Sequence, residues 1–303
     1  MSQAREGLET PAPASSWHLL DHVRSRVVDY LYLVKARLSL MVVLSSMVAY
    51  WLGAPAIVLG HLALFALGTL LVVGGANAFN QVLERELDSR MERTRNRPVP
   101  TGRIPAGEAV AAASILSLAG LLLLVVVGGA VTAGLGVLAL GIYVLVYTPM
   151  KTRSSWSTLV GALSGAIPIL MGFAAVSSSL PPMAWCLFGI LFFWQFPHTW
   201  AIAAAYREDY ERVGYRALPR RAVAIGTFLA TAAVVAASLA PFALGLTGLT
   251  YAAAALAAGA VFLAASLRFG SGAVRSRASA LLAVSLFYLP VILAVLAFDG
   301  RVS

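Results

Sequence analysis

Long blocks of apolar residues, separated by short polar stretches, fill most of the chain after residue 37. Many blocks are close to the ~20 residues that an α-helix needs to cross a bilayer. Turn-forming pairs such as Gly128-Gly129 and Pro181-Pro182 separate neighbouring blocks. The pattern predicts an all-α polytopic membrane protein, a bundle of about nine transmembrane helices. The predicted spans are 38–53, 56–83, 107–127, 130–148, 155–176, 182–206, 222–245, 248–267 and 278–298.

The composition agrees with a membrane protein. The 303 residues are 60% hydrophobic and only 12% charged, whereas about 25% of the residues in an ordinary soluble domain are charged. Residues 1–30 are predicted to form a disordered, polar N-terminal tail, and 31–303 a single intramembrane domain. Cys186 is the only cysteine, which excludes an internal disulfide and a zinc site built from several thiolates.

Charged residues are confined to alternate connections between the predicted helices. Apart from Arg301, the cations lie before the first helix or after the second, fourth, sixth and eighth, and all the acids except Asp299 share that side. The positive-inside rule makes this side cytoplasmic, with the C-terminus outside, and we expect a bacterial inner membrane. The net charge of +9 is therefore explained by topology, and no nucleic-acid partner is expected.

Three oxygen-bearing side chains end the second predicted helix. Asn80, Glu84 and Asp88 are spaced four residues apart, so they share one helix face over about 12 Å. Such oxygens suit Mg²⁺, which usually binds one or two carboxylates plus substrate phosphates. The same spacing is compatible with a solvated helix end that pairs with nearby arginines. Because acids in membrane helices are costly and mark functional sites, we favour a metal site.

Cations lie close to these acids along the chain. Arg90, Arg93, Arg95 and Arg97 follow directly, and guanidinium groups bind phosphate through paired hydrogen bonds. Carboxylates that hold a metal beside arginines would form a diphosphate site. Membrane topology and anionic lipid headgroups are the alternative explanation for part of this charge.

A second polar group ends the fourth predicted helix, where Tyr147, Lys151 and Arg153 come together. The two cations could hold phosphate or carboxylate, and the tyrosine can donate or accept a hydrogen bond. Taken singly, they are equally typical of cations that extend toward the membrane surface and of an interfacial tyrosine.

A histidine occupies the apolar part of the sixth predicted helix. His198 precedes Asp209 by eleven residues, which places it about 16 Å deeper if the segment is helical. On spacing alone, a buried histidine of this kind is more often a hydrogen-bonded core residue than a ligand. Trp194 and Gln195 lie about one turn deeper.

These motifs resemble the intramembrane prenyltransferases of the UbiA superfamily. The pattern N-x-x-x-[D/E]-x-x-x-D over residues 80–88, followed by MERTRNRPVPTGRI, is similar to the family's diphosphate motif. The stretch that begins YTPMK at Tyr147 and the run WQFPH over 194–198 resemble the branch that modifies heme. The resemblance covers about residues 30–300. It implies a nine-helix bundle with acidic sites after helices 2 and 6.

The resemblance further implies transfer of a farnesyl group from farnesyl diphosphate to heme b, which is a substrate, with Mg²⁺ as the cofactor. It implies heme contacts by Trp194, Gln195 and His198. The metal is expected at Asn80, Glu84, Asp88, Glu208 and Asp209, and the diphosphate at Lys35, Arg37, Arg93, Arg97, Lys151 and Arg153. The catalytic group is expected to comprise Asn80, Glu84, Asp88, Tyr147 and Lys151.

Other partners and two rival functions follow from the same reasoning. Membrane lipid, heme A synthase and oxidase assembly proteins are the expected partners. A UbiA-type enzyme with another acceptor, such as a quinone or a chlorophyll precursor, is the first alternative. A transporter is the second, although transporters place polar residues near the midplane, whereas the acids here lie at one end.

Overall fold

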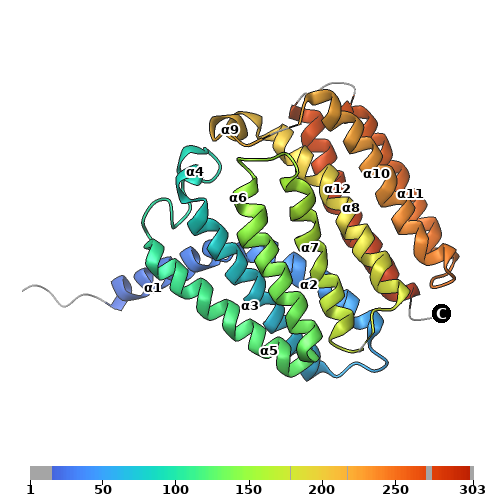
Figure 1. Cartoon of the computed structure of the whole chain (residues 1–303), viewed down its shortest axis with the longest axis horizontal. Coiled ribbons are helices and arrows are strands. Elements are labelled where there is room, and N and C mark those ends of the chain that lie inside the picture. The colour runs from blue at the N-terminus through green and yellow to red at the C-terminus, as the bar shows by residue number, and fades with distance from the viewer. Residues whose placement is uncertain (1–15, 178, 217, 271–274, 301–303) are drawn as a thin grey trace, which may run out of the picture.

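The computed structural model describes residues 16–177, 179–216, 218–270 and 275–300, and in these ranges the chain contains helices and no strand. Figure 1 shows the long helices packed side by side into a bundle. The long helices are α2 (Ala36–Gly53), α3 (Leu59–Leu83), α5 (Ala106–Gly141), α7 (Ser157–Ala174), α8 (Pro182–Ala205), α10 (Arg220–Ala243), α11 (Leu249–Gly270) and α12 (Arg275–Asp299).

Eight helical stretches in the described residues are long and apolar enough to cross a membrane. One of them, Ala106–Met150, has 45 residues, about twice the length that a bilayer requires. Its helix α5 contains a non-helical residue, Gly129, at φ 67° and ψ −165°. A side chain at Gly136 would meet Leu121 and Leu124 at 3.2 Å, so the segments before and after Gly129 pack against each other as a hairpin. The prediction of an all-helical bundle that crosses the membrane about nine times is confirmed.

The end of this hairpin differs from the prediction of a helix over 130–148. The chain forms a π-helix, η1 (Ile142–Tyr147), and then one short turn, α6 (Thr148–Met150). Pro149 has no amide hydrogen to bond to residue 145, and its ring displaces that carbonyl. The wider π turn accommodates the proline, and Lys151 follows immediately after it.

Close backbone contact joins α3 and α5. A side chain at Gly75 of α3 would meet the Ser117 Oγ of α5 at 2.3 Å, and one at Gly120 of α5 would meet the Gly68 carbonyl at 2.7 Å. Small residues at such crossings let membrane helices pack closely. The largest apolar core lies between α7, α8 and the last three helices, around side chains such as Leu187, Tyr251 and Tyr288.

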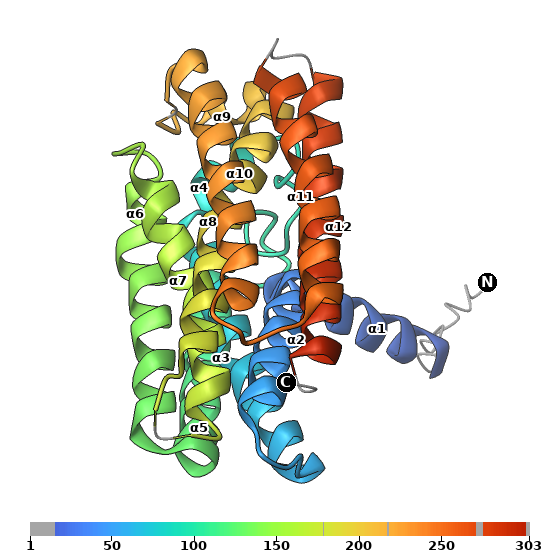
Figure 2. The same ribbon diagram turned by 90° about the vertical axis from the view of Figure 1, so that its right-hand side faces the viewer.

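Three further helices lie outside the packed bundle: α1 (Ser16–Leu33), which is as long as α2, and the short helices α4 (Arg85–Arg90) and α9 (Arg207–Arg212). The described part of the segment over 1–30, for which a disordered tail was predicted, is helical from Ser16 onward, and residues 1–15 lie outside the described ranges. Figures 1 and 2 show α4, α6 and α9 at the same end of the bundle. We call this the charged end, and define it by Lys35, Glu84, Lys151 and Asp209.

Candidate active site

The helical register of Asn80, Glu84 and Asp88 continues across a break in the helix. Helix α3 ends at Leu83 and α4 begins at Arg85, so Glu84 stands at the junction. The Glu84 amide nevertheless donates to the Asn80 carbonyl at 3.0 Å, and the Asp88 amide to the Glu84 carbonyl at 2.7 Å. All three residues are buried, with 0%, 4% and 2% of their surfaces exposed. The structure thus keeps the predicted spacing on successive turns.

Lys35 approaches this row from the turn between α1 and α2. Its Nζ donates a 2.6 Å hydrogen bond to Asn80 Oδ1, and Asn80 Nδ2 donates to Thr148 Oγ1 at 3.1 Å. Lys35 is the only non-glycine residue with positive φ in the described ranges, at φ 48°. Burial, together with the charges of Arg97 and Lys151, lowers the pKa of Lys35 to about 7. The left-handed backbone at Lys35 is unfavourable for a residue with a side chain, and it directs the amine toward Asn80.

Glu84 contacts the ammonium group of Lys151, which follows α6. The Lys151 Nζ lies 2.7 Å from Glu84 Oε1 and 3.0 Å from Oε2. Burial raises the pKa of the Glu84 carboxyl, but the charges of Lys151 and Lys35 outweigh burial and hold the pKa below its ordinary value. Burial lowers the pKa of Lys151, but Tyr147, Glu84 and Tyr215 raise it well above its ordinary value. The pair is therefore ionised in the structure.

Aromatic side chains surround the Lys151 ammonium group. Its Nζ lies 4.7 Å from the ring centre of Tyr147 and 5.9 Å from that of Tyr215, in range for cation–π attraction. The Tyr215 hydroxyl donates to Glu84 Oε1 at 3.3 Å. Tyr215 was missed in the sequence, because it lies 131 residues from Glu84 and the motif in its own connection pointed to Glu208 and Asp209 instead.

Asp88 pairs with a different cation. Arg97 NH1 donates to Asp88 Oδ2 at 2.6 Å, and the Thr94 hydroxyl donates to the Asp88 carbonyl at 3.0 Å. The loop after α4 therefore turns back over its own helix. Each of the three predicted oxygen ligands thus has its own cation. Lys35 and Lys151 come from distant connections, and Arg97 comes from the loop directly after α4.

Asp209 joins the two charged loops instead of meeting this row. Its two carboxylate oxygens accept the backbone amides of Glu92 at 2.9 Å and Arg93 at 3.1 Å. Burial raises the pKa of Asp209, but these two amides and the Arg212 charge lower it below its ordinary value. A second tie runs from the Arg216 amide to the Lys151 carbonyl at 3.0 Å. The connection after α8 thus fastens the loops that follow α4 and α6.

The remaining predicted residues lie at the exposed margin of the charged end. Arg37, Arg153 and Glu208 are exposed. Arg93 is also exposed, with its guanidinium 5.1 Å from the ring centre of Tyr206.

The donor set of the row fits a hard cation such as Mg²⁺. Asn80, Glu84 and Asp88 offer one amide and two carboxylates, the composition that leaves room for substrate phosphates. Within the described ranges, no three His, Cys, Asp or Glu side chains converge as a metal cluster. Both oxygens of Asp209 accept backbone amides, so this residue of the second acidic site has a structural role in joining two loops.

Two aromatic side chains of α8, Trp194 and His198, are held by the same residue of α12, Ser285. Trp194 Nε1 donates to the Ser285 carbonyl at 2.8 Å, and His198 Nδ1 lies 2.9 Å from Ser285 Oγ. The two rings stack with their centres 4.5 Å apart. Ser285 has one hydroxyl hydrogen, which it donates to the Leu282 carbonyl at 2.7 Å. Ser285 Oγ therefore accepts from His198 Nδ1–H, and His198 Nε2 keeps its lone pair.

Gln195 faces a small cavity of about 70 Å³ between α2, α7, α8 and α12. Its Nε2 donates to the Ala162 carbonyl at 3.0 Å. A side chain at Gly165 would lie 2.3 Å from Gln195 Oε1, so the glycine makes room for the amide. Trp194, Gly165 and Pro168 also line this cavity, together with Ser45 and apolar side chains of α2, α8 and α12.

Comparison with known proteins adds an independent finding. Residues 40–298 match the UbiA prenyltransferase family. The chain is 39% identical over 286 residues to a protoheme IX farnesyltransferase of Solibacter usitatus, which covers 89% of this chain and 98% of that protein. It is 35% identical over 318 residues to a protoheme IX farnesyltransferase of Koribacter versatilis, and that alignment covers 100% of both chains.

Solved structures share the fold at low sequence identity. A structure described for digeranylgeranylglyceryl phosphate synthase has a TM-score of 0.77 at 16% identity and covers 92% of this chain and 100% of that one. A UbiA homolog from Archaeoglobus fulgidus, bound to GPP and Mg²⁺, has a TM-score of 0.65 at 16% identity, with 89% and 99% covered.

Proposed function

The chain belongs to the UbiA prenyltransferase family, and we propose that it transfers the farnesyl group of farnesyl diphosphate to a vinyl group of heme b, which gives heme O. The names of relatives that are 35–39% identical over nearly their whole length support this choice of substrates. The WQFPH run over 194–198 supports it from within the chain.

We assign the diphosphate to the charged end. Asn80, Glu84 and Asp88 would hold Mg²⁺, and the Archaeoglobus homolog with bound Mg²⁺ and GPP supports a metal in this fold. When bound, the metal supplies positive charge to the leaving diphosphate. Lys151 and Arg97, which now neutralise Glu84 and Asp88, are close enough to bind the incoming phosphate oxygens instead.

These cations promote the first step of the reaction. The allylic C–O bond of farnesyl diphosphate breaks, and the diphosphate leaves with the electron pair. Positive side chains that are already fixed in place stabilise this developing negative charge without further reorganisation. Lys35 is the most strongly oriented of them, because a left-handed backbone and the Asn80 bond hold it. Its pKa of about 7 in the structure would rise when the diphosphate anion binds beside it, which favours the charged form.

The apolar interior serves the second step. The vinyl group attacks the farnesyl carbon, and a water molecule then adds to the new cation on the porphyrin side and loses a proton, which leaves a hydroxyl group. Apolar walls protect the first carbocation from water. We assign the heme to the region of Trp194, Gln195 and His198. His198 Nε2, with its lone pair, can bind the iron or accept a hydrogen bond.

We also propose that the charged end faces the cytoplasm of a bacterial cell and that the enzyme lies in the inner membrane. The alternating distribution of the cations supports this orientation. Farnesyl diphosphate, an anion with an apolar tail, would then enter with its head at this end and its tail in the bundle.

One observation carries the proposal: buried cations and carboxylates at one end of the bundle are joined through α8 to the fixed Trp194–His198 pair. The test is incubation of membranes containing the protein with labelled farnesyl diphosphate, hemin and Mg²⁺. We expect covalent label on the porphyrin. Label on a quinone ring would mean that the acceptor is a quinone and not heme. If the membranes bind the diphosphate but form no covalent product, the proposed transfer reaction is rejected.

A further inference from the structure

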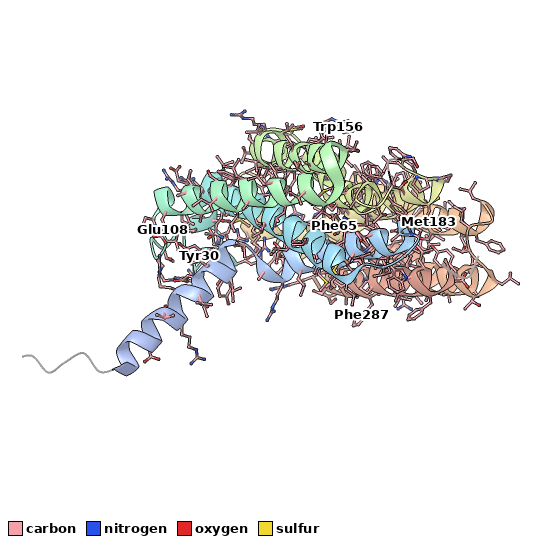
Figure 3. The ribbon with its side chains drawn as sticks, turned by 90° about the horizontal axis from the view of Figure 1, so that it is seen from below. Tyr30, Phe65, Glu108, Trp156, Met183 and Phe287 are labelled. Carbon is pink, nitrogen blue, oxygen red and sulfur yellow. The ribbon has the colours of Figure 1, made fainter. Side chains whose placement is uncertain are left out.

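Helix α1 leaves the bundle at the charged end. Figures 2 and 3 show that it extends sideways from the packed helices instead of joining them. Its last residue, Leu33, is followed by the two residues Val34 and Lys35, after which α2 begins at Ala36. Because α2 crosses the membrane from that point, α1 starts from the membrane boundary.

Polar contacts fasten one face of α1 to the bundle. Asp29 accepts a 2.9 Å bond from Arg103 Nε, and the Tyr30 hydroxyl donates to Glu108 Oε1 at 2.5 Å. Arg26 binds the Glu108 carboxylate and also the Arg103 carbonyl. Figure 3 shows Tyr30 and Glu108 close together where α1 meets the bundle. The face that touches protein thus combines these polar groups with Leu33, which is fully buried in an apolar cluster.

A second face of α1, turned by roughly 100° from the first, carries exposed apolar residues. Val23, Val27 and Leu31 are four residues apart and form one stripe; their exposed fractions are 51%, 53% and 51%. Val28 and Tyr32 flank the stripe and are also exposed. A helix on a water-soluble protein has the reverse arrangement, with apolar side chains inward and polar ones outward. The environment that covers this stripe is therefore apolar.

We propose that α1 lies along the membrane surface, with the stripe of Val23, Val27 and Leu31 inserted into the leaflet next to the charged end. Continuity supports lipid as the occupant: exposed apolar residues resume at once on α2 with Leu38, Leu40 and Met41. A protein partner that covered the stripe would have to sit within this lipid-facing surface.

The charges of the segment fit the same occupant. Arg24 on α1 and Arg37 at the start of α2 are exposed, as expected for cations that reach anionic headgroups beside an inserted apolar face. Tyr32 has a polar tip on an apolar ring, which suits the boundary between headgroups and acyl chains. The stripe, the cations and the tyrosine thus agree on an interfacial helix.

The test places a fluorophore on either side of α1 in the full-length protein. Cys186→Ala removes the only cysteine, and Val27→Cys, Leu31→Cys or Ser25→Cys is labelled with an environment-sensitive dye. The protein is reconstituted in vesicles of phosphatidylcholine and phosphatidylglycerol. At 27 and 31 we expect severalfold stronger quenching by spin-labelled lipid than by iodide. Ser25 is exposed but lies off the stripe, and should show the reverse.

Two results would overturn the proposal. Equal iodide quenching at 25, 27 and 31 would mean that the stripe faces water, and protection from both quenchers would mean that protein covers it. The unlabelled wild-type chain gives a second measurement that needs no substitution. A phospholipid with a photoreactive acyl chain should crosslink to residues 23–32 as well as to α2, and crosslinks on α2 alone would also reject insertion.

Discussion

Each oxygen ligand proposed for the metal is buried beside a cation. Removing one partner of such a pair leaves the other charge buried without compensation, which is strongly unfavourable. The Glu84–Lys151 pair, at 2.7 Å, is the clearest case, since aromatic rings surround Lys151. The pairs therefore keep cationic side chains in place where the diphosphate is expected to bind.

Glu84→Gln should lower farnesyl transfer by about 10²-fold or more, because the row loses a charged ligand and catalytic electrostatic groups contribute on this scale. The measurement is label transfer to heme as a function of Mg²⁺ concentration. Asp88→Asn should behave similarly.

Glu86→Gln is the matched control, because Glu86 lies on α4 with 77% of its side chain exposed. It should keep wild-type turnover. Wild-type turnover in Glu84→Gln at ordinary Mg²⁺ would exclude this row as the metal site.

Ser285→Ala should weaken heme binding by about tenfold, because loss of the hydrogen bond that orients a ligating histidine costs 10–100-fold in metal affinity. Binding of a farnesyl diphosphate analogue should not change. Titration with hemin, followed by absorbance, measures the heme affinity. His198→Ala should weaken heme binding more than Ser285→Ala does. Ser266→Ala is the control, since Ser266 is buried and bonds only within its own helix. Unchanged heme affinity in stable Ser285→Ala and His198→Ala proteins would contradict the assignment.

At the scale of elements, Gly129 creates the hairpin of α5. Its φ of 67° and ψ of −165° lie in a region that only glycine occupies without strain, and other residues there cost about 1–3 kcal/mol. Gly129→Ala should therefore lower the unfolding temperature measured in detergent. Gly134→Ala, in the helical part of α5 with open space around it, should leave it unchanged or raise it. An equal response of both variants would mean that the turn is not strained.

The hydrogen bonds of Asp209 to the loop after α4 lead to a second prediction at the scale of elements. Asp209→Ala removes the acceptor of two amides, and hydrogen bonds to charged groups contribute about 1.5–3 kcal/mol each. We expect faster amide exchange over 91–97 and a KM for farnesyl diphosphate raised about tenfold or more, with an unchanged Mg²⁺ requirement. Exposed Glu208 supplies the control, Glu208→Ala. A shifted Mg²⁺ requirement in Asp209→Ala would instead identify Asp209 as a metal ligand.

The pattern of apolar blocks and of the turn residues between them predicted the spanning helices to within a few residues, because lipid requires every backbone group to be bonded within its own helix. It could not predict the π turn before Lys151, which depends on how Pro149 is accommodated. It also missed the helical part of the N-terminal segment. The residues of α1 are too polar to resemble a spanning helix, and its apolar stripe is only three residues long.

For the whole molecule, the orientation remains a prediction from the cations. Single cysteines at Thr101 and Ser179, in a Cys186→Ala background, provide the test because both positions are exposed. Thr101 should react only from the cytoplasmic side and Ser179 only from the outside. The reverse pattern would overturn the proposed orientation. Ser178, an equivalent outer position, lies outside the described ranges, as do the C-terminal residues 301–303.

The sequence identified Asn80, Glu84 and Asp88 because their spacing is local. The family resemblance predicted Lys35 and Lys151 at the same site. Which cation pairs with which oxygen, and the contact of Tyr215, could not be predicted, since these residues come from separate connections whose meeting depends on the whole bundle. The same holds for Ser285, which fixes His198 from α12 although 87 residues separate them.

The long chain separations within the site have a consequence for synthesis of the protein. Glu84 is made 67 residues before Lys151 and 131 residues before Tyr215. At about 5–20 residues per second, a nascent chain waits on the order of ten seconds between the first and the last of these groups. Until Lys151 is made, about halfway through that interval, the carboxylate lacks the ammonium group that pairs with it in the folded protein, so any machinery that inserts the early helices must tolerate this acid at the membrane edge without its main partner.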